Sequence, residues 1–435
     1  MLSRFFCSRI RVILLILFIV EFFHFQLFLQ VFGSITNYKL FLIIVLFLFI
    51  WFFDNRKTCI KAKYIKKFNL LMAFLIFFVF LNCISCLYFR DQAISETLYN
   101  WSPVLLLFLF YPFYSFNIRI KDWETILLSI FIINLFIHVL ITIIPEVRSL
   151  IQVEVSDAKF EMEMRARLFS DAILLLGHLF CFNMLLIGKR RLRYSILFFI
   201  SFIAIFLLGF RTIILADMVV CFYMFIKIKG FSLKYCIISS LIVFLSLVAI
   251  STIDYVQFRY NEIIERNEEA NFNNDDYVRV LLIDYYYSSY FKNNIEMVLG
   301  SGMVRRIYRD SRDNAVYKEV YPSDYSKFVS YNSQRYHFFP VDMGLIGLSW
   351  EAGIPVVIIL ILLCLLLIIP TNSPRYLYIR GWGAFLILIS AISPYYYYHK
   401  NMIYTVIMFV IFMKLPSNSS IINNRRLKIS NNEKE

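Results

Sequence analysis

The sequence predicts an all-α polytopic membrane protein with about twelve transmembrane helices and a large external loop between the ninth and tenth. Of its 435 residues, 60% are hydrophobic and 17% are charged, and the mean hydropathy is +0.68. A soluble domain has roughly half apolar residues, and a spanning helix needs about 20 of them in a row. Two further observations support this class: basic residues lie in alternate connections between apolar runs, and the chain has a single long hydrophilic segment. The apolar composition excludes a soluble enzyme, a disordered chain and a fibrous protein.

Twelve apolar runs are predicted to form the spans. Residues 194–228 are interpreted as two spans, because 35 residues are too many for one and Gly209-Phe210-Arg211-Thr212 offers a turn. Spans one to nine occupy residues 1–253, spans ten to twelve occupy 341–415, and 416–435 form a tail. The runs are 12–32, 37–53, 69–89, 101–118, 125–144, 170–187, 194–210, 211–228, 236–253, 345–369, 381–397 and 401–415.

Lys and Arg residues orient these spans. Seven segments, namely the two tails and five alternate connections, hold 25 basic residues against five acidic ones. Short cytoplasmic connections are enriched in Lys and Arg, so we expect both termini in the cytoplasm. The formal net charge of +14 is accounted for in this way, and nucleic-acid binding is excluded. The first run is long and contains Glu21 and His24, so we expect it to be retained rather than cleaved as a signal peptide.

The predicted external face carries a large loop, 254–340, and a smaller one, 145–169. The large loop has 11 basic and 13 acidic residues and 13 of the 29 Tyr. Its segment 277–296 has a helical apolar pattern, which Gly300-Ser301-Gly302 is expected to end. All eight Cys lie in spans or cytoplasmic connections, so no external disulfide is expected, and Cys83 and Cys86 are interpreted as packing residues.

Ionisable residues inside spans are costly and are candidates for function. Three histidines, among them His138 and His178, are interpreted as hydrogen-bonded packing residues. Arg211 is different, because it lies at an external turn with almost no loop. Asp217 is six residues deeper and points to another face of the helix, so we expect it to meet a polar group on another span. The full set is Glu21, His24, His138, Asp171, His178, Arg211, Asp217, Asp342 and Glu351.

A second group of candidates lies in the external loops. Arginine presents a planar fork of donors that suits phosphate oxygens, so several Arg near the external surface would suit a lipid-linked diphosphate. A histidine among them would act as general base or acid near neutral pH. The group is Arg165, Arg167, Arg279, Arg335 and His337. Nucleotide-binding and hydrolase motifs are absent, and the histidines are isolated in sequence, so we expect neither a metal nor another cofactor.

These residues resemble the O-antigen polymerase and O-antigen ligase superfamily of bacterial envelope proteins. The number of spans and the loop after the ninth are also similar. The sequence departs from the family pattern at Leu168, where Gly is common, at Phe210, which replaces a Ser, and at Phe338, where Asn is frequent. Four patches carry the resemblance: Arg165-Ala-Arg167-Leu-Phe169-Ser-Asp171, Gly209-Phe210-Arg211-Thr212, Arg279 through Leu299-Gly300-Ser301-Gly302, and His337 through Asp342-Met-Gly344-Leu-Ile-Gly347 to Glu351-Ala-Gly353-Ile354.

The resemblance implies a type C glycosyltransferase fold in the bacterial inner membrane, with a periplasmic large loop. It implies metal-independent, inverting transfer from an undecaprenyl-diphosphate-linked oligosaccharide, with the lipid bilayer and a chain-length regulator as further partners. Arg211 and Arg279 would hold the diphosphate, and His337 would orient or deprotonate the acceptor hydroxyl. The residues expected to assist in binding substrate are Arg165, Arg167, Arg335 and Asp342.

Three functions fit these residues. A polymerase joins lipid-linked repeat units, and the Phe-Pro-x-Asp-x-Gly-Leu-Ile-Gly stretch that begins at Phe339 is more like polymerases. A ligase would use the same chemistry to transfer the glycan to the lipid A core. A flippase or other transporter of lipid-linked sugar usually has two related halves, and no such repeat is visible. The sequence favours the polymerase.

Overall fold

The computed structural model of the chain describes residues 64–90, 93–116, 118–144, 171–188, 191–207, 211–230, 293–302, 344–369, 373–391 and 399–415, together with Ile13, Leu17 and Phe291. Within these ranges the regular structure is entirely helical, without a strand. The all-α prediction is confirmed for this part of the chain.

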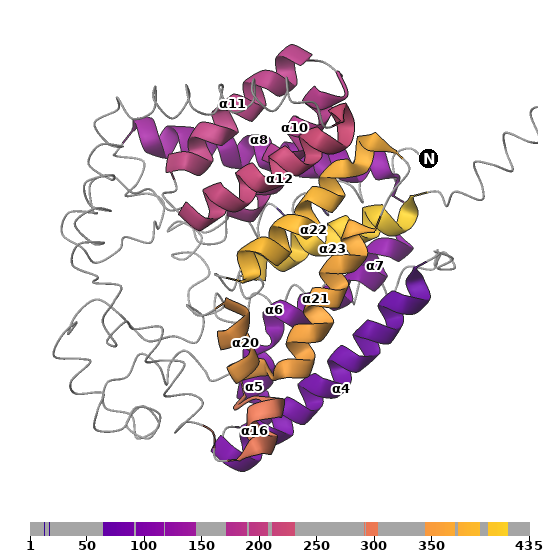
Figure 1. The fold of residues 1–435 in the computed structure, drawn as a ribbon, viewed down its shortest axis with the longest axis vertical. Helices are drawn as coiled ribbons and strands as arrows, with labels where there is room; N and C mark the ends of the chain where they lie inside the picture. Colours follow the sequence, from indigo (N-terminus) through magenta and orange to yellow (C-terminus); the bar gives the residue numbers. More distant parts are fainter. Residues whose placement is uncertain are drawn as a thin grey trace, which may run out of the picture.

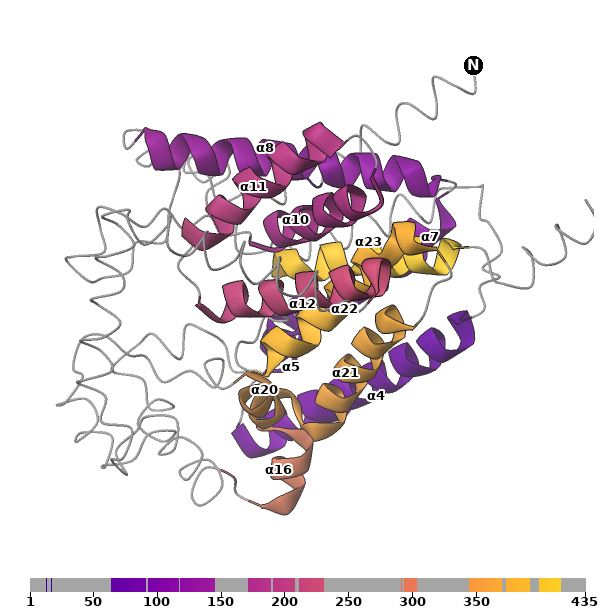
Figure 2. The same cartoon turned by 45° about the horizontal axis from the view of Figure 1, so that its top comes forward.

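The helices are grouped around a central pair (Figure 1). Helix α22 packs against α21, α12 and α10, and α23 packs against α7, α6 and α10. Figure 2 shows α4 and α21 side by side, in agreement with their contacts. The N-terminal helices are α4 (Ile65–Arg90), α5 (Ile94–Asn100), α6 (Ser102–Leu105), the 3₁₀ turn η2 (Leu106–Leu109), α7 (Phe110–Ser115) and α8 (Ile120–Ile143). The others are α10 (Asp171–Leu186), α11 (Arg191–Leu207), α12 (Arg211–Lys229), α16 (Asn294–Leu299), α20 (Gly344–Ala352), α21 (Ile354–Ile368), η5 (Pro374–Tyr376), α22 (Leu377–Ser390) and α23 (His399–Lys414).

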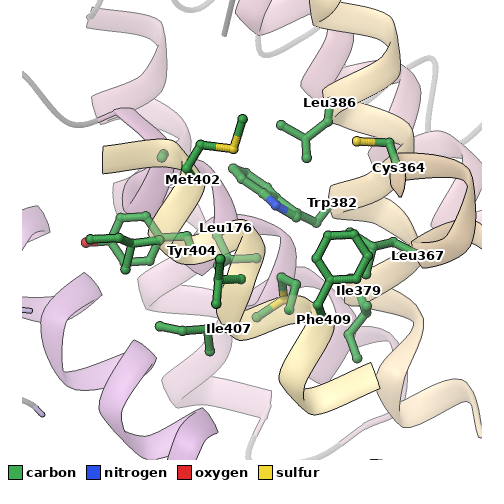
Figure 3. Close-up of a cluster of buried hydrophobic side chains, with 14 of the residues drawn as sticks. Leu176, Cys364, Leu367, Ile379, Trp382, Leu386, Met402, Tyr404, Ile407 and Phe409 are labelled. Carbon is green, nitrogen blue, oxygen red and sulfur yellow. The ribbon is translucent and has the colours of Figure 1, made fainter. Parts of the chain in front are cut away.

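The buried core lies where α10, α21, α22 and α23 meet (Figure 3). Trp382 of α22 is fully buried, and its indole Nε1 donates to Thr405 Oγ1 of α23 at 3.2 Å. A buried indole N–H needs such a partner, because leaving it unpaired costs more than the bond itself contributes. Small residues bring the helices close. A Cβ on Gly383 would lie 2.9 Å from Leu367 Cβ of α21.

Nine of the twelve predicted runs coincide with described helices; runs 12–32, 37–53 and 236–253 lie outside the described residues, apart from Ile13 and Leu17. The prediction of one continuous helix is wrong for one of the nine. The run 101–118 is a continuous helical segment, Ser102–Ser115, with the 3₁₀ turn η2 between α6 and α7. The run 345–369 is divided into α20 and α21 at Gly353, which has φ of +90° and precedes Pro355.

Two described helical segments, Ile65–Phe89 and Ile120–Leu140, are long and apolar enough to cross a membrane. Shorter apolar helices accompany them, including Ala172–Leu186 and Ile354–Ile368. Helix α4 is apolar on its exposed face as well as on its buried one. The exposed residues recur every three or four positions and include Leu70, Phe74, Phe77, Phe80, Ile84 and Leu87. Helices that are apolar all round are typical of membrane spans and of large buried cores.

Candidate functional site

Of the predicted catalytic residues, only the backbone of Arg211 lies within the described part of the chain. It is the first residue of α12, where the predicted run 211–228 also begins. Its side chain is outside the described residues, and so are the other six candidates: Arg165, Arg167, Arg279, Arg335, His337 and Asp342. The structure therefore describes the scaffold beside these residues, not the predicted catalytic group itself.

Helix α22 ends at Ser390, and the directions of the helices place Arg211, the start of α12, at the same end of the bundle. A Cβ on Gly381, near the start of α22, would lie 2.7 Å from Met224 Sδ, near the end of α12. His178 contacts Asp217 in the first halves of α10 and α12, whereas Asn183, near the end of α10, contacts Arg375 just before α22. Together these contacts show that α12 and α22 are antiparallel. Gly344, the first residue of α20, is at that same end, because a Cβ there would lie 2.6 Å from the Ser390 carbonyl oxygen. Arg211 and the start of α20 therefore share one end of the bundle.

At this end a short segment of the large loop packs into the break between α20 and α21. Helix α16 starts at Asn294, and the Asn293 side chain caps it by accepting from Glu296 N at 2.8 Å. Asn293 itself is extended, so the predicted helix over 277–296 does not continue through it. Gly300 ends α16, as predicted. Figure 1 shows α16 beside α4 and α20, and contacts join it to both and to α21.

The loop segment donates hydrogen bonds to carbonyl groups that lack a helical N–H partner at the break. In a continuous helix the Glu351 carbonyl would accept from residue 355, but Pro355 has no N–H. Gly302 N donates to it instead at 3.0 Å. Ser301 donates to the Trp350 carbonyl through its backbone N at 2.8 Å and its Oγ at 3.1 Å. Buried carbonyls need such partners, so the loop segment and the helix break form one unit.

Asn82 of α4 ties this unit to the rest of the bundle. Its Nδ2 donates to the carbonyls of Leu299, at 2.7 Å, and of Glu351, at 2.9 Å. Its Oδ1 accepts from Trp101 Nε1 at 3.0 Å. Asn82 is fully buried, and its hydrogen bonds to Glu351 and Trp101 are shielded from competing solvent. One turn further along α4, Ser85 Oγ donates to the Gly300 carbonyl at 3.0 Å.

Cys86 completes the contact of α4 with the loop segment. A Cβ on Gly302 would lie 2.2 Å from Cys86 Sγ, so only a residue without a side chain fits there. Cys83 and Cys86 are both buried, which confirms their interpretation as packing residues.

A separate charged group lies at the other end of the bundle. Arg375 of η5 donates to Glu124 Oε2 of α8 at 2.5 Å, and Tyr378 Oη donates to Glu124 Oε1 at 3.3 Å. Partial burial works against the charge of Arg375, but the carboxylate of Glu124 outweighs it and raises the pKa of Arg375. Asn183, near the end of α10, donates to the Arg375 carbonyl at 2.5 Å. Helix α10 therefore begins, at Asp171, at the same end of the bundle as Arg211.

Lys414, the last residue of α23, is fixed at this charged end as well. Its Nζ donates to the carbonyls of Phe116, at 2.8 Å, and Ile118, at 2.9 Å, and lies 5.6 Å from the ring centre of Tyr114. The ends of α7 and α23, the start of α8 and η5 are thus linked by charged side chains.

A third polar group lies inside the bundle between α10, α11 and α12. His178 Nε2 is 3.2 Å from Asp217 Oδ2, and His178 Nδ1 is 2.9 Å from Ser201 Oγ. His178 and Asp217 are 1% and 2% exposed. The prediction that Asp217 meets a polar group on another helix is confirmed, and so is the hydrogen-bonded interpretation of His178. Sequence reasoning missed that Cys221 joins them, although its spacing of four from Asp217 is the helical repeat.

No model of a known protein family matches this chain, and no relative is found among curated proteins.

Proposed function

We propose that the chain is a polytopic glycosyltransferase of the O-antigen polymerase type in a bacterial inner membrane. In this proposal about twelve spans place both termini in the cytoplasm and the large loop in the periplasm. The two long apolar helices and the exposed apolar face of α4 support a membrane location, because so extended an apolar face is unusual on a soluble monomer.

The observation that carries the proposal is the contact between the segment Gly300–Gly302 and the break Glu351–Gly353. These are parts of two of the four patches on which the resemblance depends, and about 50 positions separate them. They pack as one hydrogen-bonded unit at the end of the bundle where α12 begins. A loop anchored in this way is suited to cover a reaction centre and to exclude water from a glycosyl donor.

Chain connectivity supports a common site for the remaining candidates. Arg167 precedes Asp171, the first residue of α10, by only four positions, and His337 precedes Gly344 by seven. Seven extended residues span at most roughly 25 Å. Because α10, α12 and α20 all begin at one end of the bundle, the proposal assigns Arg167, Arg211 and His337 to that end.

The proposed reaction joins two undecaprenyl-diphosphate-linked glycans. The acceptor hydroxyl attacks the anomeric carbon of the donor, the bond to the diphosphate oxygen breaks, and undecaprenyl diphosphate leaves. Arg211 and Arg279 bind the diphosphate and stabilise the charge that develops on it. His337 orients the hydroxyl and takes its proton. The residues proposed to assist are Arg165, Arg167, Arg335 and Asp342.

The test is single substitution in a strain that lacks the gene, with each variant expressed at the wild-type level. The variants are Arg211→Ala, Arg279→Ala and His337→Ala, together with Arg211→Lys, which keeps the charge and loses the bidentate fork. Lys229→Ala is the control, because Lys229 is an exposed cation at the opposite end of α12. Surface polysaccharide is then separated by length on a gel.

We expect the three Ala variants to lose the polysaccharide ladder while a single capped repeat unit remains, and Lys229→Ala to keep the ladder. A full ladder from every variant would contradict the assignment of these residues. Loss of all surface glycan, including the single unit, would instead favour a ligase or a transporter of lipid-linked oligosaccharide.

A further inference from the structure

The polar group between α10, α11 and α12, in which His178 and Asp217 are buried and Cys221 is half-buried, has the composition of a metal site. His178 offers a ring nitrogen, Asp217 a carboxylate oxygen and Cys221 a sulfur, and these three ligand atoms lie within 4.8 Å of one another. Contacts join all three helices to each other, and Figure 2 shows them as neighbours. None of the three residues belongs to the proposed glycosyl-transfer site.

The hydrogen bonds of Ser201 define which nitrogen of His178 faces the group. Ser201 Oγ donates to the Phe198 carbonyl at 2.9 Å, so its oxygen remains to accept from His178 Nδ1–H, also at 2.9 Å. This assigns the ligating lone pair to Nε2, which faces Asp217. A histidine that binds a metal usually donates its other N–H in this way, which fixes the ring orientation.

Asp217 has one oxygen that its neighbours do not satisfy. Its Oδ2 faces His178 Nε2, whereas Oδ1 has no hydrogen-bond partner among the residues that the structure describes, although the side chain is 98% buried. An unsatisfied buried carboxylate oxygen is costly, and a bound cation removes that cost.

We propose that His178 Nε2, Asp217 and Cys221 Sγ bind a Zn²⁺ ion inside the helical bundle. Nitrogen, carboxylate oxygen and thiolate sulfur are the ligands that zinc prefers, and water commonly completes a set of three. Around tetrahedral zinc the ligand atoms are roughly 3.3–3.8 Å apart, so the observed group needs to contract by about 1.5 Å at most. Asp217 and Cys221 are one helical turn apart, so side-chain rotation is sufficient.

Charge balance favours this ion over a monovalent one. As zinc ligands, the Asp217 carboxylate and the Cys221 thiolate carry one negative charge each, and the neutral His178 imidazole carries none. A divalent ion balances these two charges, whereas a monovalent ion leaves one of them uncompensated in a low-dielectric interior, where such a charge is expensive.

The experiment uses the full chain, purified in detergent with an affinity tag that contains no histidine and stripped with a chelator. The chain is first titrated with Co²⁺, and Zn²⁺ is then added to the cobalt-loaded chain; a separate sample is titrated with Zn²⁺ alone. We expect one ion per chain, a near-ultraviolet band from a cobalt–thiolate bond, and loss of that band when zinc displaces cobalt.

The variants distinguish this site from binding elsewhere. Cys221→Ser is expected to abolish the band and, like Asp217→Asn, to weaken zinc binding by at least about 10-fold. Ser201→Ala is expected to weaken it about 10-fold and to keep the band, since Ser201 acts only through His178. Cys364→Ser, at a buried cysteine of α21, is the matched control and is expected to change neither.

Failure of the folded wild-type chain to bind either ion would overturn the proposal, and so would a thiolate band that persists in Cys221→Ser. Circular dichroism of each variant establishes that it remains helical. The titration measures metal binding alone, so its result is independent of the reaction that the chain catalyses.

Discussion

Gly300 and Gly353 pack backbone against backbone at the joint between the large loop and the helical bundle. A Cβ on Gly300 would lie 2.5 Å from Gly353 N, and a Cβ on Gly353 would lie 2.5 Å from the Leu299 carbonyl oxygen. Both residues have φ near +90° and ψ near +150°, at 84° and 155° for Gly300 and 90° and 152° for Gly353. That region is essentially restricted to glycine.

Replacing either glycine by alanine should open this joint. Gly300→Ala and Gly353→Ala each combine a disfavoured backbone conformation with overlap against main-chain atoms that cannot move aside. We expect each to lower the free energy of unfolding by about 3 kcal/mol or more, measured by denaturation in detergent. Gly230→Ala is the control, because Gly230 has φ of +79° with nothing within 4 Å, and about 1 kcal/mol is expected there. Equal effects at all three positions would mean that the packing between the glycines contributes nothing.

Asn82→Asp should disrupt the same joint without changing side-chain shape. The carboxylate loses the Nδ2 donors and faces the carbonyl oxygens of Leu299 and Glu351, which repel it. We expect a loss of about 3 kcal/mol, because buried acceptors are left unpaired beside a buried charge. The matched control is Asn69→Asp on the exposed face of α4, where Oδ1 only accepts from Tyr111 Oη. A melting temperature that falls equally for the two variants would argue against this role of Asn82.

Two arginine–carboxylate pairs whose carboxylates lie on α8 allow a comparison of buried and exposed ion pairs. Arg375 is 28% exposed and Glu124 is 7% exposed, whereas Arg119, paired with Asp122, is 77% exposed. We expect Glu124→Gln to lower the free energy of unfolding by about 2 kcal/mol. This is less than the loss for a fully buried pair, because water still reaches Arg375. Asp122→Asn should cost less than about 0.5 kcal/mol. Thermal unfolding of the two variants measures which substitution costs more stability. A larger loss from Asp122→Asn would mean that the buried pair does not contribute more than the exposed one.

The orientation of the spans can be tested with a reporter that is active only outside the cytoplasm. Fusion of alkaline phosphatase after Gly230 should give an inactive enzyme, because Lys227, Lys229 and Lys234 are predicted to be cytoplasmic. Insertion of the same reporter into the loop 254–340 should give an active enzyme. Activity from the fusion after Gly230 would overturn the predicted topology.

Periodicity and composition were sufficient to locate most helices. Nine apolar runs coincide with described helices, and α12 begins at Arg211, where the predicted run 211–228 begins. These features are local, because the length and apolarity of a segment are properties of consecutive residues. The helix break at Gly353 was missed, because glycine and a nearby proline only favour a break, and packing partners decide whether it forms.

Local patterns alone determined the all-α class, the positions of the helices and the position of Gly300 as a helix end. Only the tertiary structure decided which distant residues meet. It placed Gly300 against Gly353, Asn82 across both of their segments, and His178 beside Asp217 and Cys221. Such pairings depend on how whole helices pack, which no local spacing encodes. Isolated residues in the sequence therefore became a joint and a proposed metal site only once the bundle was assembled.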